Sequence, residues 1–168
     1  MVISYAIYPT SLCNIALLAM DGKLFELRLV EEEEMVIKKL ILSRFPDAYE
    51  DEAQFKVLRI LLERYFRGEN VGFDVDVVFP SSTPFEKKVF LETRTIPYGE
   101  TRTYGWLAEK IGYRNASRAV GQALRRNPIP LIIPCHRVIQ KDGRLGGFSC
   151  GVHIKRRLLE LEGIKLEK

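Results

Sequence analysis

The chain has 168 residues, 46% of them hydrophobic and 29% charged, which is the composition of an ordinary globular protein rather than a disordered or disulfide-rich one. No apolar run approaches the roughly 18–20 residues that span a bilayer, and the N-terminus lacks a basic leader, so we expect an intracellular, cytoplasmic protein (nuclear in a eukaryote) with no membrane association. Three scattered cysteines and two histidines favour neither a disulfide framework nor a metal site, and we expect no metal and no cofactor.

Charge is distributed unevenly along the chain. Residues 1–83 hold 9 Lys/Arg and 14 Asp/Glu, a net charge of −5, whereas residues 84–168 hold 17 and 8, a net charge of +9. A basic half beside an acidic half indicates a polyanionic partner such as nucleic acid on the basic side. The alternative is that exposed helices simply carry lysines.

The first 80 residues predict a small α/β unit, with the apolar N-terminus read as strands. The pair Asp21-Gly22 is typical of a tight hairpin between two strands. Apolar periodicity and breakers at Pro46 and Gly68 set the helix limits. The predicted elements are strands at Asn14–Met20, Lys23–Val30 and Phe73–Val78, and helices at Glu31–Phe45 and Glu52–Phe66.

The segment from Pro80 to Pro84 is the best linker candidate, and it divides the chain into an N-terminal domain, 1–80, and a C-terminal domain, 81–168. Thr83 is then expected to cap a helix, with Pro84 as its first residue and Glu86 completing a capping box. The elements expected after the linker are helices at Pro84–Thr95, Tyr104–Ile111, Asn115–Arg126 and Val152–Glu162, and strands at Leu131–Ile133 and Val138–Gln140.

Two short helices around the turn at Gly112 are typical of a helix-turn-helix. On the second helix, an apolar stripe is expected to face the core, and an adjacent stripe is small and polar. Small residues let a helix approach another surface closely, and that surface is either another helix or a groove of DNA. The apolar stripe consists of Ala116, Val120 and Leu124. The adjacent stripe consists of two small residues, Ser117 and Gly121, and the polar Arg125.

Cys135 is the candidate nucleophile. It follows an apolar run, and His136 and Arg137 place positive charge beside it, which is what favours a reactive thiolate. Adjacent side chains rarely hydrogen-bond well, so any proton path from Cys135 to His136 is expected to pass through a water or across the turn. A plain buried cysteine is the alternative.

Glu162 strengthens the candidate site. It lies close to the apolar face formed by Ile154, Leu158 and Leu161 on the last helix, where a carboxylate is costly unless it is paired. Pairing with His136 would give a Cys–His–Glu relay. Alternatively, Glu162 is an exposed residue at a frayed helix end.

Several motifs together resemble the O6-alkylguanine-DNA alkyltransferases (methylated-DNA–protein-cysteine methyltransferases). They are Arg118-Ala119-Val120-Gly121, Asn127-Pro128, Pro134-Cys135-His136-Arg137-Val138 and Gly146-Gly147-Phe148-Ser149. The resemblance covers the chain from about Thr83 to Gly163. It implies a ribonuclease-H-like α/β N-terminal module and a mainly α, winged-helix-like C-terminal domain with a helix-turn-helix.

The resemblance also implies an activity: single-turnover transfer of an alkyl group from O6-alkylguanine in double-stranded DNA to Cys135, by a monomer without an obligate protein partner. Because a stacked guanine O6 is out of reach of a buried sulfur, the base must first be flipped out of the duplex. Acceptance of O4-alkylthymine, the preferred alkyl group and any role of Cys13 or Cys150 stay open.

Residue roles follow from the same resemblance. His136 and Glu162 would form a relay through a bound water, and Tyr104 would protonate the departing guanine and help to rotate the nucleotide. Arg118 would fill the gap in the base stack, and Asn127 would tie the recognition helix to the active-site turn. The substrate pocket would comprise Val138, Phe148, Ser149 and Asn127, and further DNA contacts would come from Ser117, Gly121, Arg125 and Lys141. Phe148 departs from the tyrosine found in many members.

Two other classes of protein compete with this reading. A non-reactive lesion sensor would share the C-terminal half but carry Trp in place of the cysteine, so Cys135 argues against it. A winged-helix regulator, with Cys135 purely structural, is permitted by the basic helix pair.

Overall fold

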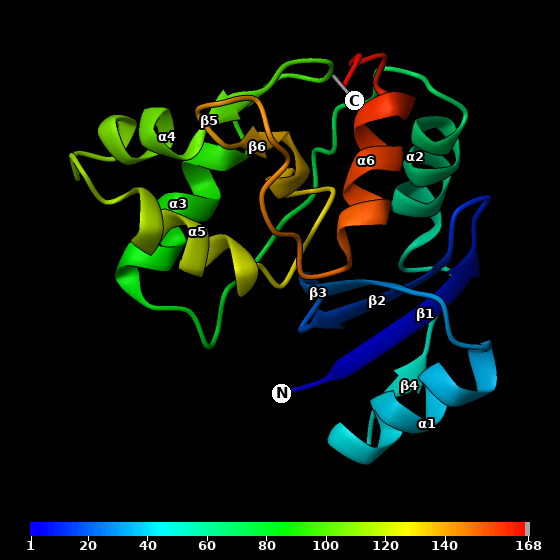
Figure 1. Cartoon of the computed structure of the whole chain (residues 1–168). Helices are drawn as coiled ribbons and strands as arrows, with labels where there is room; N and C mark the ends of the chain where they lie inside the picture. Colours follow the sequence, from blue (N-terminus) through cyan, green and yellow to red (C-terminus); the bar gives the residue numbers. More distant parts are fainter. Residues whose placement is uncertain (167–168) are drawn as a thin grey trace. The chain divides into compact units, whose positions relative to one another are not determined.

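The computed structural model describes residues 1–166 and divides the chain into two compact units, Met1–Pro80 and Ser81–Lys168 (Figure 1). The N-terminal unit is α/β and the C-terminal unit is mainly helical, as the sequence predicts. Within the described residues, no helix is both long enough and apolar enough to cross a membrane.

The N-terminal unit is built on a four-stranded sheet in the order β3-β2-β1-β4. Neighbouring strands are antiparallel except β1 and β4, which are parallel. The hairpin between β2 and β3 is confirmed, because Asp21 and Gly22 both have positive φ, as a tight two-residue turn requires. The strands are β1 (Ile3–Pro9), β2 (Asn14–Met20), β3 (Lys23–Val30) and β4 (Tyr49–Glu50).

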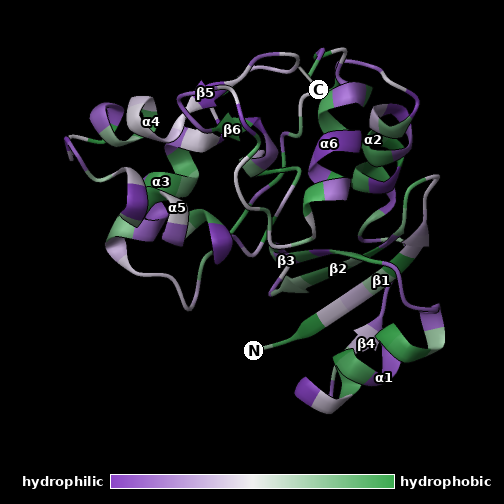
Figure 2. Ribbon diagram, viewed as in Figure 1, coloured by the Kyte–Doolittle hydropathy of each residue, from purple (hydrophilic) through white to green (hydrophobic). Residues whose placement is uncertain are grey.

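Two helices complete this unit, and both begin later than predicted. Helix α1 is Glu34–Arg44 and buries Ile37 and Ile41 against the sheet; helix α2 is Lys56–Phe66. Glu33 is the extended N-cap of α1, so the preceding glutamates lie outside its first turn. Residues 52–55 form turns before α2. Figure 2 shows both hydrophobic and hydrophilic residues in α2, and its buried residues Leu58, Leu62 and Tyr65 recur every three or four positions, as in an amphipathic helix.

The strand predicted at Phe73–Val78 is wrong. Only Val77 forms a bridge, with Leu24, supported by hydrogen bonds from Leu24 N to Asp76 O and from Val78 N to Leu24 O. Burial still alternates over residues 73–77. The period-two pattern therefore reports which side chains are covered, not whether the backbone joins a ladder.

The C-terminal unit contains three helices that pack against one another: α3 (Pro84–Thr93), α4 (Tyr104–Lys110) and α5 (Ser117–Arg125). The capping box at the start of α3 is confirmed, since Thr83 and Glu86 exchange both hydrogen bonds. A small parallel pair, β5 (Arg102–Thr103) and β6 (Val138–Ile139), and the last helix, α6 (Val152–Leu161), complete the unit.

The apolar run Leu131–Ile133 is buried but is not a strand. Leu131 has φ 72°, Ile133 N donates to Ile129 O, and the only pairing here is an isolated bridge between Pro130 and Ile133. Proline removes backbone donors, and the prolines at 128, 130 and 134 flank this segment and limit the length over which it could pair as a strand. The chain turns tightly instead and enters a 3-10 turn, η1 (Cys135–Arg137), which carries the candidate nucleophile.

Candidate active site

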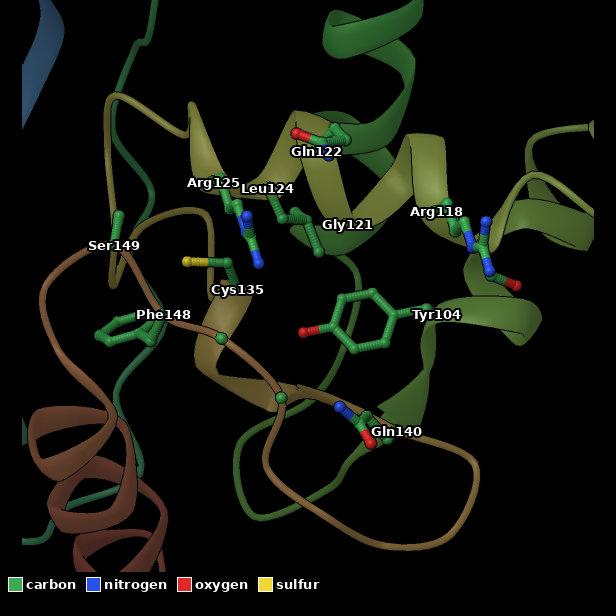
Figure 3. Close-up of a pocket in the computed structure, with 13 residues that line it drawn as sticks. Tyr104, Arg118, Gly121, Gln122, Leu124, Arg125, Cys135, Gln140, Phe148 and Ser149 are labelled. Atoms are coloured by element: carbon green, nitrogen blue, oxygen red, sulfur yellow. The ribbon is translucent and has the colours of Figure 1, made fainter.

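Cys135 lies at the start of η1 and lines a cavity of about 360 Å³ (Figure 3). The cavity is formed by α4, α5, η1 and the loop of residues 140–149. Its side chains mix one nucleophile, two arginines, a phenol and several small residues. The lining residues are Tyr104, Ser117, Arg118, Gly121, Gln122, Leu124, Arg125, Cys135, Gln140, Gly146, Gly147, Phe148 and Ser149.

Eight residues singled out in the sequence line this one cavity, although they come from four separate stretches of chain. Figure 3 shows Cys135 and Tyr104 on neighbouring walls, with the Arg125 side chain reaching down from α5 between them. The eight are Tyr104, Ser117, Arg118, Gly121, Arg125, Cys135, Phe148 and Ser149. Sequence reasoning missed Gln122, Leu124 and Gln140 as lining residues, because nothing in their type or spacing distinguishes them from core or surface positions.

Asn127 and Val138 support the cavity rather than line it. Asn127 is buried; its Nδ2 donates to Ile133 O at 2.9 Å, and its Oδ1 accepts from Ile129 N at 3.0 Å. Val138 is fully buried in β6. Lys141 is exposed on the loop outside the cavity lining.

His136 and Glu162 form a buried pair. His136 Nε2 lies 2.6 Å from Glu162 Oε1, and neither side chain is exposed. Glu162 is the C-cap of α6 and is 5% exposed, so the alternative of a frayed, solvated end does not hold. The carboxylate also accepts from the backbone N of Gly99 at 3.1 Å.

Arg137 points away from the nucleophile, contrary to the sequence expectation. Its guanidinium donates to both oxygens of Glu162 and, through Nη1, to Ile96 O at 2.7 Å. The guanidinium also lies 5.8 Å from the centre of the Tyr98 ring. Its charge is therefore directed at the carboxylate rather than at Cys135.

The protonation states of the pair follow from this geometry. Burial alone raises the pKa of Glu162, but the hydrogen bonds and charges of His136 and Arg137 outweigh it and lower the pKa to about 2. Burial lowers the pKa of His136, and the contact with Glu162 only partly opposes it. At neutral pH the site thus holds an ionised carboxylate beside a neutral imidazole.

Cys135 rests as a thiol. Burial raises its pKa to about 11, and the opposing effects of Asn127 and Lys155 are smaller. The charge of Arg137, which was expected to favour a thiolate, does not do so here, because Arg137 is paired with Glu162 and Cys135 is only 4% exposed. A reaction at this sulfur needs a base that removes the proton during the chemical step.

Lys155 is a buried residue of the site that the sequence reasoning missed. Its ammonium group donates to Val138 O at 2.7 Å, to Leu145 O and, more weakly, to Gly147 O at 3.4 Å. It lies 5.8 Å from the Tyr104 ring centre, and burial lowers its pKa to about 8. The available signal was its spacing of three and four residues from Leu158 and Leu159, which places it on the buried face of α6.

The Tyr104 ring packs closely against Gly146, which has no side chain to push it away. A Cβ atom there would lie 2.7 Å from the tyrosine hydroxyl oxygen, and Gly146 has φ 73°, so both space and backbone favour glycine. Burial raises the pKa of Tyr104, so its hydroxyl keeps its proton at neutral pH. The cavity therefore offers a nucleophilic sulfur, a base behind it and a proton donor across from it.

Known proteins share this fold. Residues 84–164 match the family model for the DNA-binding domain of 6-O-methylguanine DNA methyltransferase. A methylated-DNA–protein-cysteine methyltransferase of Methanosarcina acetivorans is 51% identical over 119 residues, which cover 70% of this chain and 76% of that protein. The chain belongs to the methylated-DNA–protein-cysteine methyltransferase family.

Solved structures extend the likeness to nearly the whole chain. The Mycobacterium tuberculosis OGT, crystallised in complex with DNA, is 37% identical with a TM-score of 0.81, covering 95% of this chain and 92% of that one. The O6-methylguanine-DNA methyltransferase of the hyperthermophilic archaeon Pyrococcus kodakaraensis is 28% identical with a TM-score of 0.71, covering 96% and 99%.

Proposed function

We propose that this protein repairs DNA by moving an alkyl group from O6 of guanine to its own Cys135. The observation that carries the proposal is the position of Cys135: it lines a cavity bounded by the helix pair α4–α5, and the next residue in the chain, His136, is buried and paired with Glu162. Family membership supports the same activity.

The chemical step is an in-line displacement at the alkyl carbon. The Cys135 sulfur forms a bond to that carbon as its bond to O6 breaks, and the electron pair of the broken bond stays with the guanine. Neutral His136 takes the thiol proton through a bound water, and Tyr104 gives a proton to the departing base. The His136 imidazolium then releases its proton to solvent and the Tyr104 phenolate takes one up, so that overall the alkyl group passes to sulfur and one proton passes to guanine.

The reaction ends with an alkylated protein. A thioether has no ready leaving group, so the alkyl group stays on the acceptor sulfur. Each protein molecule is therefore used once.

Access to O6 requires the nucleotide to leave the stack, at a cost of a few kcal/mol. We assign this work to α4 and α5, whose cavity-facing residues Ser117 and Gly121 are small enough for close approach to the minor groove. Arg118 is exposed on the first turn of α5, where its planar cation can occupy the vacated space (Figure 3). Arg125 and Lys141 are assigned to phosphate contacts.

Of the remaining residues, two line the pocket and two support it. Phe148 and Ser149 wall the guanine, whereas Asn127 and Val138 fix the backbone around Cys135 from behind. We further propose that the protein acts as a monomer on double-stranded DNA in the compartment that holds the genome: the cytoplasm of a prokaryote or the nucleus of a eukaryote.

A repair titration tests this function. A duplex carrying a single O6-methylguanine is mixed with increasing amounts of protein, and the methylguanine that remains is measured after the reaction is complete. We expect the amount repaired to equal the amount of active protein. Binding without any loss of methylguanine would identify a lesion sensor or a winged-helix regulator instead, and repair of many lesions per protein would contradict single turnover.

A further inference from the structure

We propose that Arg137 is a positioning residue for alkyl transfer: by holding both oxygens of Glu162, its guanidinium keeps His136 uncharged, with the proton of the imidazole on Nε2 facing the carboxylate. This inference rests on the proposed function, because its importance lies in the ability of His136 to accept the thiol proton.

The geometry gives the carboxylate two cationic or potentially cationic neighbours at once. Glu162 Oε1 lies 2.6 Å from His136 Nε2 and accepts from Arg137 Nη2 at 2.9 Å. Oε2 accepts from Arg137 Nε at 3.0 Å and from Gly99 N at 3.1 Å. Nη1 of the same guanidinium donates to Ile96 O at 2.7 Å, which fixes the orientation of the guanidinium against the carboxylate.

A buried carboxylate paired with imidazole alone would draw a proton onto the ring. Here the guanidinium, which cannot lose its proton in a protein, already balances the carboxylate charge. The charged groups around His136 are Lys155 on α6, Glu162 at the C-cap of α6, and Arg137 on the same turn as His136. Burial, Arg137 and Lys155 lower the pKa of His136, and Glu162 alone raises it.

The neutral form is the useful one because Cys135 rests as a thiol. An imidazolium has no lone pair and cannot take the proton, whereas a neutral ring with Nε2–H directed at Glu162 accepts at Nδ1. Arg137 would in this way set the lower pH limit of the reaction without touching the substrate or the sulfur.

A purely structural role is the competing explanation, since Arg137 also ties η1 to the turn at residues 96–99 and to α6. The two roles differ in pH dependence. Loss of a structural tie lowers the rate by the same factor at every pH. Loss of the balancing charge raises the pKa of His136, so the rate of alkyl transfer falls only on the acid side of its pH profile.

The test is an NMR titration of His136 in the parent protein, R137K and R137Q. The chain has two histidines, so an H153Q background leaves a single ring to observe, and His153 is exposed and outside the cavity. In the parent we expect a neutral ring with the proton on Nε2 at pH 6–7. R137K keeps the positive charge, so its His136 should titrate at nearly the same pH as in the parent. R137Q should titrate about one pH unit higher or more, a tenfold change in the protonation equilibrium.

Single-turnover rates on free O6-benzylguanine give the second readout. Relative to the parent, the rate of R137Q should fall progressively as the pH drops below the pKa of its own His136, toward a tenfold loss for each unit by which that pKa has risen, and it should be closest to the parent rate at pH 8. An unchanged His136 titration in R137Q, or a loss of rate that is equal at all pH values, would overturn the proposal. A cationic or Nδ1-protonated ring in the parent at pH 6–7 would do so even if R137Q failed to fold. Because the NMR readout does not depend on alkyl transfer, it separates failure of this inference from failure of the proposed function.

Discussion

His136 Nε2 lies 2.6 Å from Glu162 Oε1, with both side chains shielded from solvent. The two residues are 26 positions apart in the chain, and the contact joins the active-site turn to the end of the last helix. Since the carboxylate is ionised and the ring is neutral, this contact orients a base without charging it.

Glu162→Gln should slow alkyl transfer by about 100-fold or more, because the amide orients the imidazole poorly and lowers its basicity. It should also destabilise the fold by ~3–5 kcal/mol, since Arg137 is left buried without a carboxylate. Single-turnover rates and a denaturant titration measure the two effects. Glu160→Gln, an exposed change on the same helix, is the matched control. Parent-like rates in E162Q would refute the relay.

The same variant tests a pH dependence of stability. The pKa of Glu162 is about 2 in the folded protein, against an ordinary value of 4.5. A depressed carboxyl pKa contributes stability that is complete above the ordinary value and is lost as pH falls from about 4.5 toward about 2. The stability difference between parent and E162Q should shrink over that window. A difference independent of pH would contradict the assigned ionisation.

Lys155→Met should loosen the loop around Gly147 and lower stability, because buried carbonyls lose their donor at about 1–3 kcal/mol each. The pKa of Lys155 is lowered from 10.5 to about 8, so in the parent the unfolded chain binds more protons between these values and stability should rise with pH there. Denaturant midpoints from pH 7 to 11 check both points. Arg156→Met, at an exposed neighbouring site, serves as the control. A parent and K155M with parallel pH profiles would show that the lysine does not titrate in this range.

Arg118→Ala should separate base flipping from chemistry. Free O6-benzylguanine diffuses to Cys135 without flipping, so the variant should react with it at nearly the parent rate. On duplex DNA its rate should fall by an amount equivalent to about 1–3 kcal/mol, from lost stacking and hydrogen bonding. Arg157→Ala, an exposed change on α6 outside the cavity lining, is the comparison. Equal losses of R118A on both substrates, with a lower melting temperature, would instead point to a structural arginine.

DNA affinity should fall steeply as salt rises and should depend little on sequence. Residues 84–168 carry a net charge of +9, and the contacts assigned here are to phosphates and to the shape of the groove. Fluorescence anisotropy with several undamaged duplexes over a range of salt concentrations measures both properties. A flat plot of log affinity against log salt would contradict the basic surface as the DNA-binding face.

Much of the local structure could be predicted from the sequence where the interacting residues lie close together in the chain. The capping box at Thr83 and Glu86 and the hairpin at Asp21-Gly22 are confirmed because each depends on residues within one turn of each other. The strands predicted at Phe73–Val78 and Leu131–Ile133 are wrong because a ladder needs a partner elsewhere in the chain, and burial alone leaves the same apolar pattern.

In the candidate site, too, some features could be predicted from the sequence and others depend on contacts between distant segments. A carboxylate on an apolar helix face correctly predicted that Glu162 is buried and paired with His136. The partners of Arg137 and Lys155 are backbone carbonyls and a shared carboxylate, which leave no pattern in the sequence. The thiol state of Cys135 was missed for the same reason, since it follows from burial and from where the neighbouring charge points.

The most direct test of the central claim is to locate the alkyl group after reaction. The protein is incubated with a duplex carrying O6-methylguanine and digested, and the cysteine-containing peptides are analysed by mass spectrometry, with C13S, C150S and C135A in parallel. We predict the mass of one methyl group on Cys135 in the parent, C13S and C150S, and no transfer in C135A, which should still bind the duplex. Methyl found on Cys13 or Cys150, or repair that persists in C135A, would contradict the assignment of Cys135 as the acceptor.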